Sequence, residues 1–292
     1  MRNRLVRCVH NFIQRLRADG CTGLAGMLAY NFFLALPALL IFMITVLAFL
    51  PVEDVVSQTT GQLSEVLPAD ALSLLTRVLE TTLQRGRGSL TVLFLSLLGT
   101  MYVLNNGYAG LIGSMNRIYN FDETRPWLRV RLRALVMSVI ASGLLVATFG
   151  MLLVAPLIVH ALSADQGFDL TVGFWLERMR WPAILFLAVL GIESTYRYAP
   201  NGRLRFRLIS PGTFFATGFW LLATLAFGFY VDHFNSYQSV YGGLGAVIVI
   251  LTWLWISAMI FLTGAEINVV WHEWRESRIR HPARTTSPAP DV

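Results

Sequence analysis

Residues 242–265 read GGLGAVIVILTWLWISAMIFLTGA, a run of 24 residues without a charged side chain. A helix needs about 20 apolar residues to cross the hydrocarbon core of a bilayer. The whole chain has the same bias, because 55% of its 292 residues are hydrophobic and 14% are charged, against roughly a quarter charged in soluble domains. Dissolved in water, such a chain would expose large apolar patches. The run therefore predicts a transmembrane helix in a membrane protein.

Other segments along the chain have the same length and character. The six predicted spans lie near 28–50, 89–111, 134–160, 181–199, 209–230 and 242–265. The first follows a basic region, but its apolar run is too long for a signal peptide, so it predicts an uncleaved span. We therefore expect an all-α fold, a polytopic transmembrane helical bundle of about six spans.

The arginines predict the orientation of this bundle. All 23 basic residues are arginine. Eighteen of them lie before the first span, between spans two and three, between spans four and five, or after the last span. The other side holds only Arg77, Arg85, Arg87, Arg178 and Arg180. Because cytoplasmic loops carry the excess of basic residues, we expect both termini in the cytoplasm.

Three regions complete the predicted organisation. Residues 1–20 carry an apolar stripe opposite arginines, which predicts an amphipathic helix on the cytoplasmic face, lying on the inner leaflet or packed on the ends of the spans. The membrane domain covers 21–275 and includes an external loop, 51–88, with helical periodicity. Residues 276–292 lack apolar content, which predicts a disordered cytoplasmic tail.

Short sequence words in the last third, and a few earlier ones, resemble a known family. They are Tyr196-Arg-Tyr-Ala-Pro-Asn201, Pro211-Gly212, Tyr241-Gly-Gly-Leu-Gly245, Gly264-Ala-Glu-Ile-Asn268, Ala29-Tyr30, Leu36-Pro37, Asn116-Arg117 and Arg125-Pro126. Their order and spacing over roughly residues 10–275 resemble the YihY/BrkB family.

The resemblance implies a six-span protein of the bacterial cytoplasmic (inner) membrane. That family was formerly labelled ribonuclease BN, a label regarded as a misassignment, and lipid or lipopolysaccharide-precursor transport has been proposed for it. The resemblance implies no catalytic residue that could be transferred to this chain.

Polar residues at one depth of the predicted membrane are the candidate substrate site. A charged side chain within a span is costly and normally has a partner or a task. The candidates are Glu193, Asn106, Asn105, Asn31, Glu266 and Arg197. One interpretation is a polar cavity that opens towards the cytoplasm. The other is structural: Glu193 and Arg197 are spaced to pair on one helix face, and asparagines often join transmembrane helices.

Prolines and glycines inside the spans predict kinks and close packing. Pro37 and Pro156 each remove a helix hydrogen bond. Gly242, Gly243 and Gly245 open the last span, where glycine allows close approach of helices or acts as a hinge.

The sequence favours two functions and leaves a channel as a further alternative, for which no filter-like ring can be read without the oligomer. The first is transport or flipping of a lipid-like envelope component through the polar cavity. The alternative is a non-transporting scaffold for envelope proteins. The expected partners are membrane lipids, with further copies of the chain or envelope proteins, and no nucleic acid. Neither the cysteines nor the histidines have metal-ligand spacing, so we expect no metal, no cofactor and no enzymatic activity, ribonuclease included.

Overall fold

The computed structural model describes residues 10, 12–47, 90–151, 170–202, 209–233 and 243–280. Within these ranges the protein is helical and contains no strand. A short helix covers residues 12–18. The long helices are α2 (Cys21–Leu47), α5 (Leu90–Ile118), α6 (Trp127–Phe149), α8 (Leu170–Tyr198), α9 (Pro211–His233) and α11 (Gly243–Arg280).

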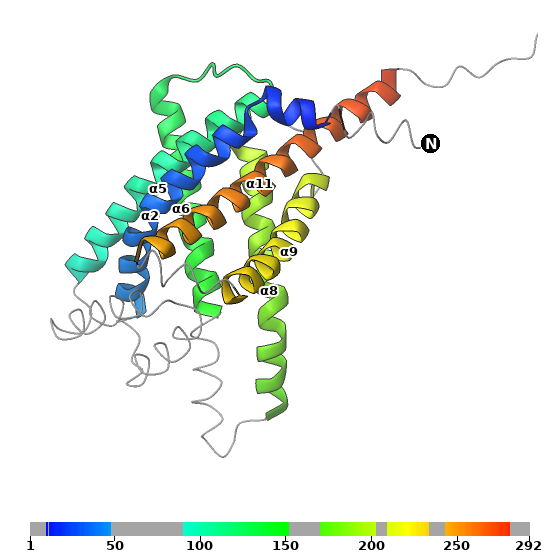
Figure 1. Cartoon of the computed structure of the whole chain (residues 1–292). Helices are drawn as coiled ribbons and strands as arrows, with labels where there is room; N and C mark the ends of the chain where they lie inside the picture. Colours follow the sequence, from blue (N-terminus) through cyan, green and yellow to red (C-terminus); the bar gives the residue numbers. More distant parts are fainter. Residues whose placement is uncertain are drawn as a thin grey trace, which may run out of the picture.

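The long helices form a bundle in which α11 lies between α2 and α9 (Figure 1). Helix α2 packs extensively against α5 and α11. Helix α11 also packs against α9, and α5 also packs against α6. Helix α8 packs less extensively against its neighbours α6 and α9. The buried apolar core lies mainly between α2, α5 and α11 and includes Leu28, Ile112, Met115 and Leu262. The bundle therefore has a tightly packed side around α2, α5 and α11 and a loosely packed side around α8.

The helices confirm the predicted all-α membrane bundle. By length and hydropathy, four helical stretches in the described part of the chain could cross a bilayer: Cys21–Leu40, Trp127–Thr148, Pro211–Tyr230 and Val247–Arg275. Helices α5 and α8 have 29 residues each, or roughly 40 Å, while a hydrocarbon core is about 30 Å thick. The six-span count and the orientation stay predictions. The external loop 51–88 lies outside the described residues.

Helix α11 continues beyond the predicted span to Arg280. It therefore includes the first residues of the segment expected to be disordered from 276, whereas 281–292 lie outside the described residues. Charged residues beyond Glu266 do not interrupt the helix, because a helix that leaves the membrane tolerates polar side chains.

The predicted kink and packing residues fall in different surroundings. Pro37 lies inside α2 with an exposed side chain. Gly243 begins α11, and Gly245 is buried in its first turn. Pro156 and Gly242 lie outside the described residues.

Helices α9 and α11 approach each other closely at Gly212 and Gly264. A Cβ atom at Gly212 would collide with the Gly264 carbonyl oxygen and the Asn268 side-chain amide. A Cβ atom at Gly264 would collide with the Tyr196 hydroxyl and the Gly212 carbonyl oxygen. Glycine lacks a Cβ, so the two backbones can meet directly.

We expect Gly212→Ala to destabilise the bundle by about 1–3 kcal/mol, because the added methyl overpacks this contact. Gly218→Ala on the same helix is the matched control, since nothing lies within 4 Å of a Cβ at that position. Thermal unfolding in detergent compares the two variants. An unfolding temperature for Gly212→Ala equal to that of Gly218→Ala would refute the direct backbone contact.

Candidate functional site

One end of the bundle gathers most of the buried polar groups of the described residues. This end, here called the polar end, comprises residues 12–21, 116–127, 193–213 without 203–208, and 264–275, at the top of Figure 1. It is the end that the arginine pattern predicts to face the cytoplasm. The polar residues predicted from sequence lie near it, but in separate places rather than around one cavity.

Helix α9 begins at the polar end with Ser210-Pro211-Gly212-Thr213. The Thr213 amide donates a hydrogen bond to the Ser210 hydroxyl oxygen (3.3 Å), so Ser210 is the N-cap residue. Proline follows in the first helical position, where its missing N–H is not needed. Ser210, Gly212 and Thr213 are buried, so the free N–H groups of the first turn need partners from the protein.

Glu193 of α8 supplies acceptors for this turn. Its Oε2 atom accepts hydrogen bonds from the Ser210 amide (3.0 Å), the Ser210 hydroxyl (2.8 Å) and the Thr213 hydroxyl (2.6 Å). A carboxylate at a helix N-terminus is also stabilised by the helix dipole. Glu193 thus fastens α8 to the start of α9.

Asn268 of α11 completes the cap from the other side. Its Oδ1 atom accepts a hydrogen bond from the Gly212 amide (2.7 Å), and its Nδ2 group donates to the Ser210 hydroxyl oxygen (3.1 Å). Three helices therefore meet at one helix start. Sequence reasoning did not single out Asn268 as a site residue, although Ser-Pro-Gly-Thr before an apolar run is a helix-start signal that demands such partners.

Two buried polar atoms beside the cap lack a hydrogen-bond partner within the described residues, Glu193 Oε1 and the Tyr119 hydroxyl. Tyr119 follows α5 and stacks on Phe121. Its burial raises the pKa of the phenol well above the usual value, so the hydroxyl stays protonated.

Asn105 and Asn106 of α5 bind Arg131 of α6 instead of facing Glu193. Asn105 donates to the Arg131 carbonyl oxygen (3.1 Å), and Arg131 Nη1 donates to Asn106 Oδ1 (2.8 Å). Asn31 donates to the Met27 carbonyl oxygen within its own helix (2.9 Å). These contacts fit the structural interpretation of asparagines in transmembrane helices.

Glu266 lies in a further place, between α11 and the N-terminal residues. Its side chain is fully buried, the Cys21 thiol lies 3.9 Å from Oε1, and Arg15 Nε lies 3.7 Å from Oε2. Arg15 also makes a two-bond contact with Glu273 (2.7 and 2.8 Å), which raises the pKa of its guanidinium. This cluster fastens the 12–18 helix to α11.

Arg197 does not pair with Glu193 in the described structure. Its guanidinium lies over the Tyr198 ring, 5.7 Å from the ring centroid, and its side chain is exposed. The interpretation of an i,i+4 ion pair was therefore wrong, because Glu193 turns towards the start of α9 instead.

The turn between α5 and α6 is bonded to the segment after α8. Asn116 Oδ1 accepts a hydrogen bond from the Asn201 amide (2.7 Å), and Asn116 Nδ2 donates to Glu123 (2.6 Å). Arg125 makes two hydrogen bonds of 2.6 Å to the same Glu123 carboxylate and contacts the Ala199 carbonyl oxygen. Three of the words used for the family resemblance, Asn116-Arg117, Arg125-Pro126 and Tyr196–Asn201, thus meet at the polar end and hold loops together there.

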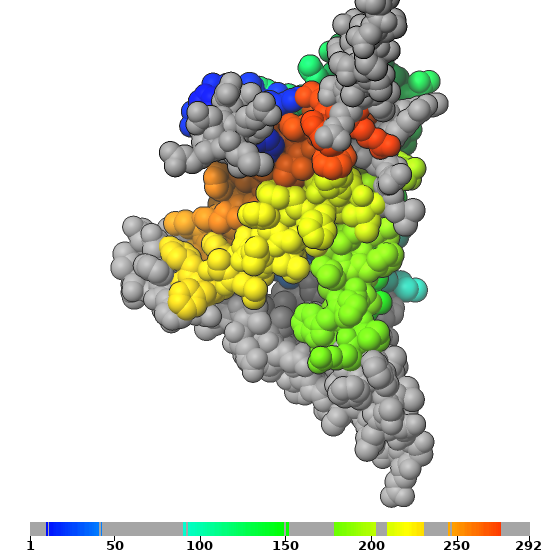
Figure 2. All heavy atoms as spheres, turned by 90° about the vertical axis from the view of Figure 1, so that its right-hand side faces the viewer, coloured from blue at the N-terminus to red at the C-terminus, as the bar shows by residue number. Residues whose placement is uncertain are grey.

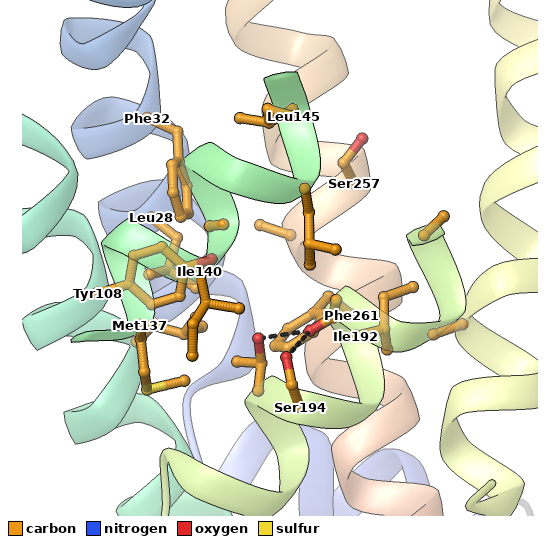
Figure 3. A pocket seen from close by; sticks show the side chains of 18 of the residues that line it. Leu28, Phe32, Tyr108, Met137, Ile140, Leu145, Ile192, Ser194, Ser257 and Phe261 are labelled. Carbon is orange, nitrogen blue, oxygen red and sulfur yellow. Dashed lines mark hydrogen bonds between the residues drawn. The ribbon is translucent and has the colours of Figure 1, made fainter. Parts of the chain in front are cut away.

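A cavity of about 820 Å³ lies between the helices, next to the polar end. Figure 3 shows Phe32 of α2, Tyr108 of α5, Met137 and Ile140 of α6, and Phe261 of α11 around it. Figure 2 shows the side formed by α8 and α9, with a hollow between these two helices. The volume is within the range of roughly 300–1,000 Å³ found for ligand pockets.

The lining of this cavity differs from the expected polar cavity. Aliphatic and aromatic side chains predominate, and none of the six predicted substrate-binding residues contributes to it. Equal depth in the membrane does not bring these six residues around this cavity, because depth does not fix which way each side chain points around its helix axis. The polar lining residues are Tyr108, Arg133, Thr148, Ser194, Thr195, Tyr198 and Ser257. Tyr198 belongs to the polar end, and Arg133 lies beside it.

The described residues contain no group of three or more histidine, cysteine, aspartate or glutamate side chains placed to hold a metal ion. Their buried carboxylates, Glu193 and Glu266, lie in helix and segment contacts. The arrangement can therefore enclose an apolar molecule beside a polar rim.

Comparison with known proteins gives related membrane proteins. A family profile described as "Virulence factor BrkB" matches residues 12–288. The "Putative ribonuclease-like protein YfkH" of Bacillus subtilis is 30% identical over 262 residues, covering 87% of this chain and 91% of the relative. The "UPF0761 membrane protein NT05HA_1801" of Aggregatibacter aphrophilus is 24% identical, covering 92% and 93%. A "UPF0761 membrane protein" of Tolumonas auensis is 27% identical, covering 91% and 86%. No solved structure matches the chain.

We expect Glu193→Ala to destabilise the protein by about 1–3 kcal/mol, because the buried donors of the α9 cap lose their acceptor. Glu193→Gln should cost less, since an amide oxygen can still accept. Arg197→Gln is the control and should leave the thermal unfolding temperature unchanged. Equal losses for Glu193→Ala and Arg197→Gln would restore the ion-pair interpretation.

Acid should weaken the contact between the α5–α6 turn and residues 199–202. The hydrogen bonds from Arg125 lower the pKa of Glu123 below its ordinary value of 4.5. Stability from this carboxylate is therefore present above about pH 4.5 and is lost as the pH falls through the lowered folded-state value. Unfolding temperatures from pH 6 to pH 3 should fall more steeply for wild type than for Glu123→Gln. Parallel curves would contradict this role.

Proposed function

Because the chain is an integral membrane protein that belongs to the BrkB family, we propose that it binds a lipid-like amphiphile within the bilayer and carries it between the two leaflets. The observation that carries this proposal is the cavity of about 820 Å³ between the helices. Apolar walls suit acyl or prenyl chains, because burying apolar surface in a fitted pocket is favourable.

The position of the cavity supports an occupant with two chemically different ends. Leu28, Phe32 and Leu144 supply apolar wall, while Arg133 and Tyr198 line the cavity at the polar end. A molecule with an apolar tail and a polar headgroup could satisfy both parts at once. A purely polar solute would leave the apolar walls uncovered, and a hydrocarbon would leave the polar rim unused.

The packing of α8 supports entry from the membrane. Helix α8 contacts α6 and α9 less extensively than α2 contacts α5 and α11. The hollow between α8 and α9 lies on this lightly packed side (Figure 2). Elements with few packing contacts are the ones that open at low cost in free energy. We therefore place the lateral entrance between α8 and its neighbours.

Our proposal includes the bacterial cytoplasmic membrane as location, with the polar end on the cytoplasmic side. The arginine distribution supports this orientation. The proposal contains no catalytic step, because the buried polar groups of the polar end serve as helix caps and loop contacts. The alternative is a scaffold that holds partner proteins through the external loop, which lies outside the described residues, or through the basic cytoplasmic face.

Filling the cavity should remove lipid binding and transport. Ala188 of α8 lines the cavity, so Ala188→Trp would place an indole ring inside it. We expect this variant to lose most of the lipid that wild type retains in native mass spectrometry. Transfer of a fluorescent phospholipid across proteoliposome membranes should fall to the protein-free rate.

The matched control is Ala226→Trp, which adds the same ring at an exposed position of α9 outside the cavity lining. It should keep both the bound lipid and the transfer rate. The proposal is wrong if both variants behave as wild type, or if wild-type protein neither retains lipid nor accelerates transfer. Unfolding temperatures of both variants separate cavity filling from loss of the fold.

A further inference from the structure

Arg125, Arg129, Arg131 and Arg133 precede or begin α6, and a positive-inside pattern treats them alike. The structure distinguishes them by their partners. Arg125 makes a two-bond ion pair with Glu123. Arg131 donates to Asn106 and contacts Asn105. Arg133 lines the cavity, and Arg129 does not.

The guanidinium of Arg133 uses few of its hydrogen-bond donors within the protein. Arg133 Nη1 donates one long hydrogen bond, 3.4 Å, to the Pro200 carbonyl oxygen. No ion pair joins Arg133 to a carboxylate within the described residues, and its side chain is exposed. A guanidinium has five N–H donors, so most of the Arg133 donors remain available to a molecule in the cavity.

The electrostatic surroundings leave the positive charge of Arg133 uncompensated. The charge of Arg125 repels the Arg133 guanidinium, and the charge of Glu123 attracts it. Because these two neighbours form an ion pair with each other at 2.6 Å, their effects on a third charge largely offset. The rim of the cavity therefore keeps approximately the charge of one arginine.

We infer that Arg133 binds the headgroup phosphate of a lipid with net negative charge, and so selects anionic lipids for the cavity. This inference rests on the proposed function. Guanidinium groups bind phosphate oxygens through two parallel N–H···O bonds. Tyr198, at the same rim and 52% exposed, adds a hydroxyl that can donate to a second headgroup oxygen. A zwitterionic headgroup would bring its own cation close to Arg133, where like charges repel.

The test measures lipid selectivity. Purified full-length protein is equilibrated with equal amounts of phosphatidylglycerol and phosphatidylcholine, and the bound lipid is counted by native mass spectrometry. We expect wild type to favour phosphatidylglycerol by roughly tenfold, because one charge-assisted hydrogen bond changes the affinity by about that factor. Arg133→Gln should reduce the ratio to about one while total bound lipid changes little. Arg133→Lys should keep part of the preference, because the charge remains.

Arg129→Gln is the matched control, because Arg129 is an exposed arginine of the same helix outside the cavity lining. It removes the same charge and should keep the tenfold preference. The inference is overturned if Arg133→Gln keeps the preference, if Arg129→Gln loses it equally, or if wild type shows none. Loss of total bound lipid in Ala188→Trp, together with unchanged selectivity in Arg133→Gln, would retain the proposed function and reject the role of Arg133.

Discussion

The buried start of helix α9 is the constraint on which the polar end depends. Its first backbone N–H groups cannot be left without acceptors in a water-poor interior. Glu193 from α8 and Asn268 from α11 meet this need, so three helices are held in fixed positions. The glycine contact between α9 and α11 can then form beside the cap. The cavity follows along the same three helices, which supply Ile192, Ala216 and Phe261 to its lining.

Most of the fold could be predicted from the sequence, because a bilayer imposes its thickness on each apolar run. Each predicted span overlaps a helix of the structure. The ends were predicted less well: α5 extends through Arg117 and α6 begins at Trp127, before its arginines. A hydropathy pattern ends where charged residues begin, whereas a helix continues as long as its backbone bonds and side-chain contacts are favourable.

The candidate site could be predicted only in part. Glu193 was recognised as costly inside a span, but its partners depend on how α8 is rotated towards α9, which depth alone does not fix. The cavity was missed because its apolar lining has the same composition as surfaces that face lipid. Arg133 was counted only as a topology signal, since one sequence gives every arginine the same weight. Its open guanidinium appears only when the partners of Arg125 and Arg131 are known.

The contact between Gly212 and Gly264 has a consequence for how related sequences can vary. At each position the backbone of the other glycine leaves no room for a Cβ atom. A larger residue at one position therefore cannot be compensated by a smaller residue at the other. Glycine has no smaller substitute. Two positions in direct contact would then carry no correlated substitutions, and methods that infer proximity from covariation would miss this helix crossing.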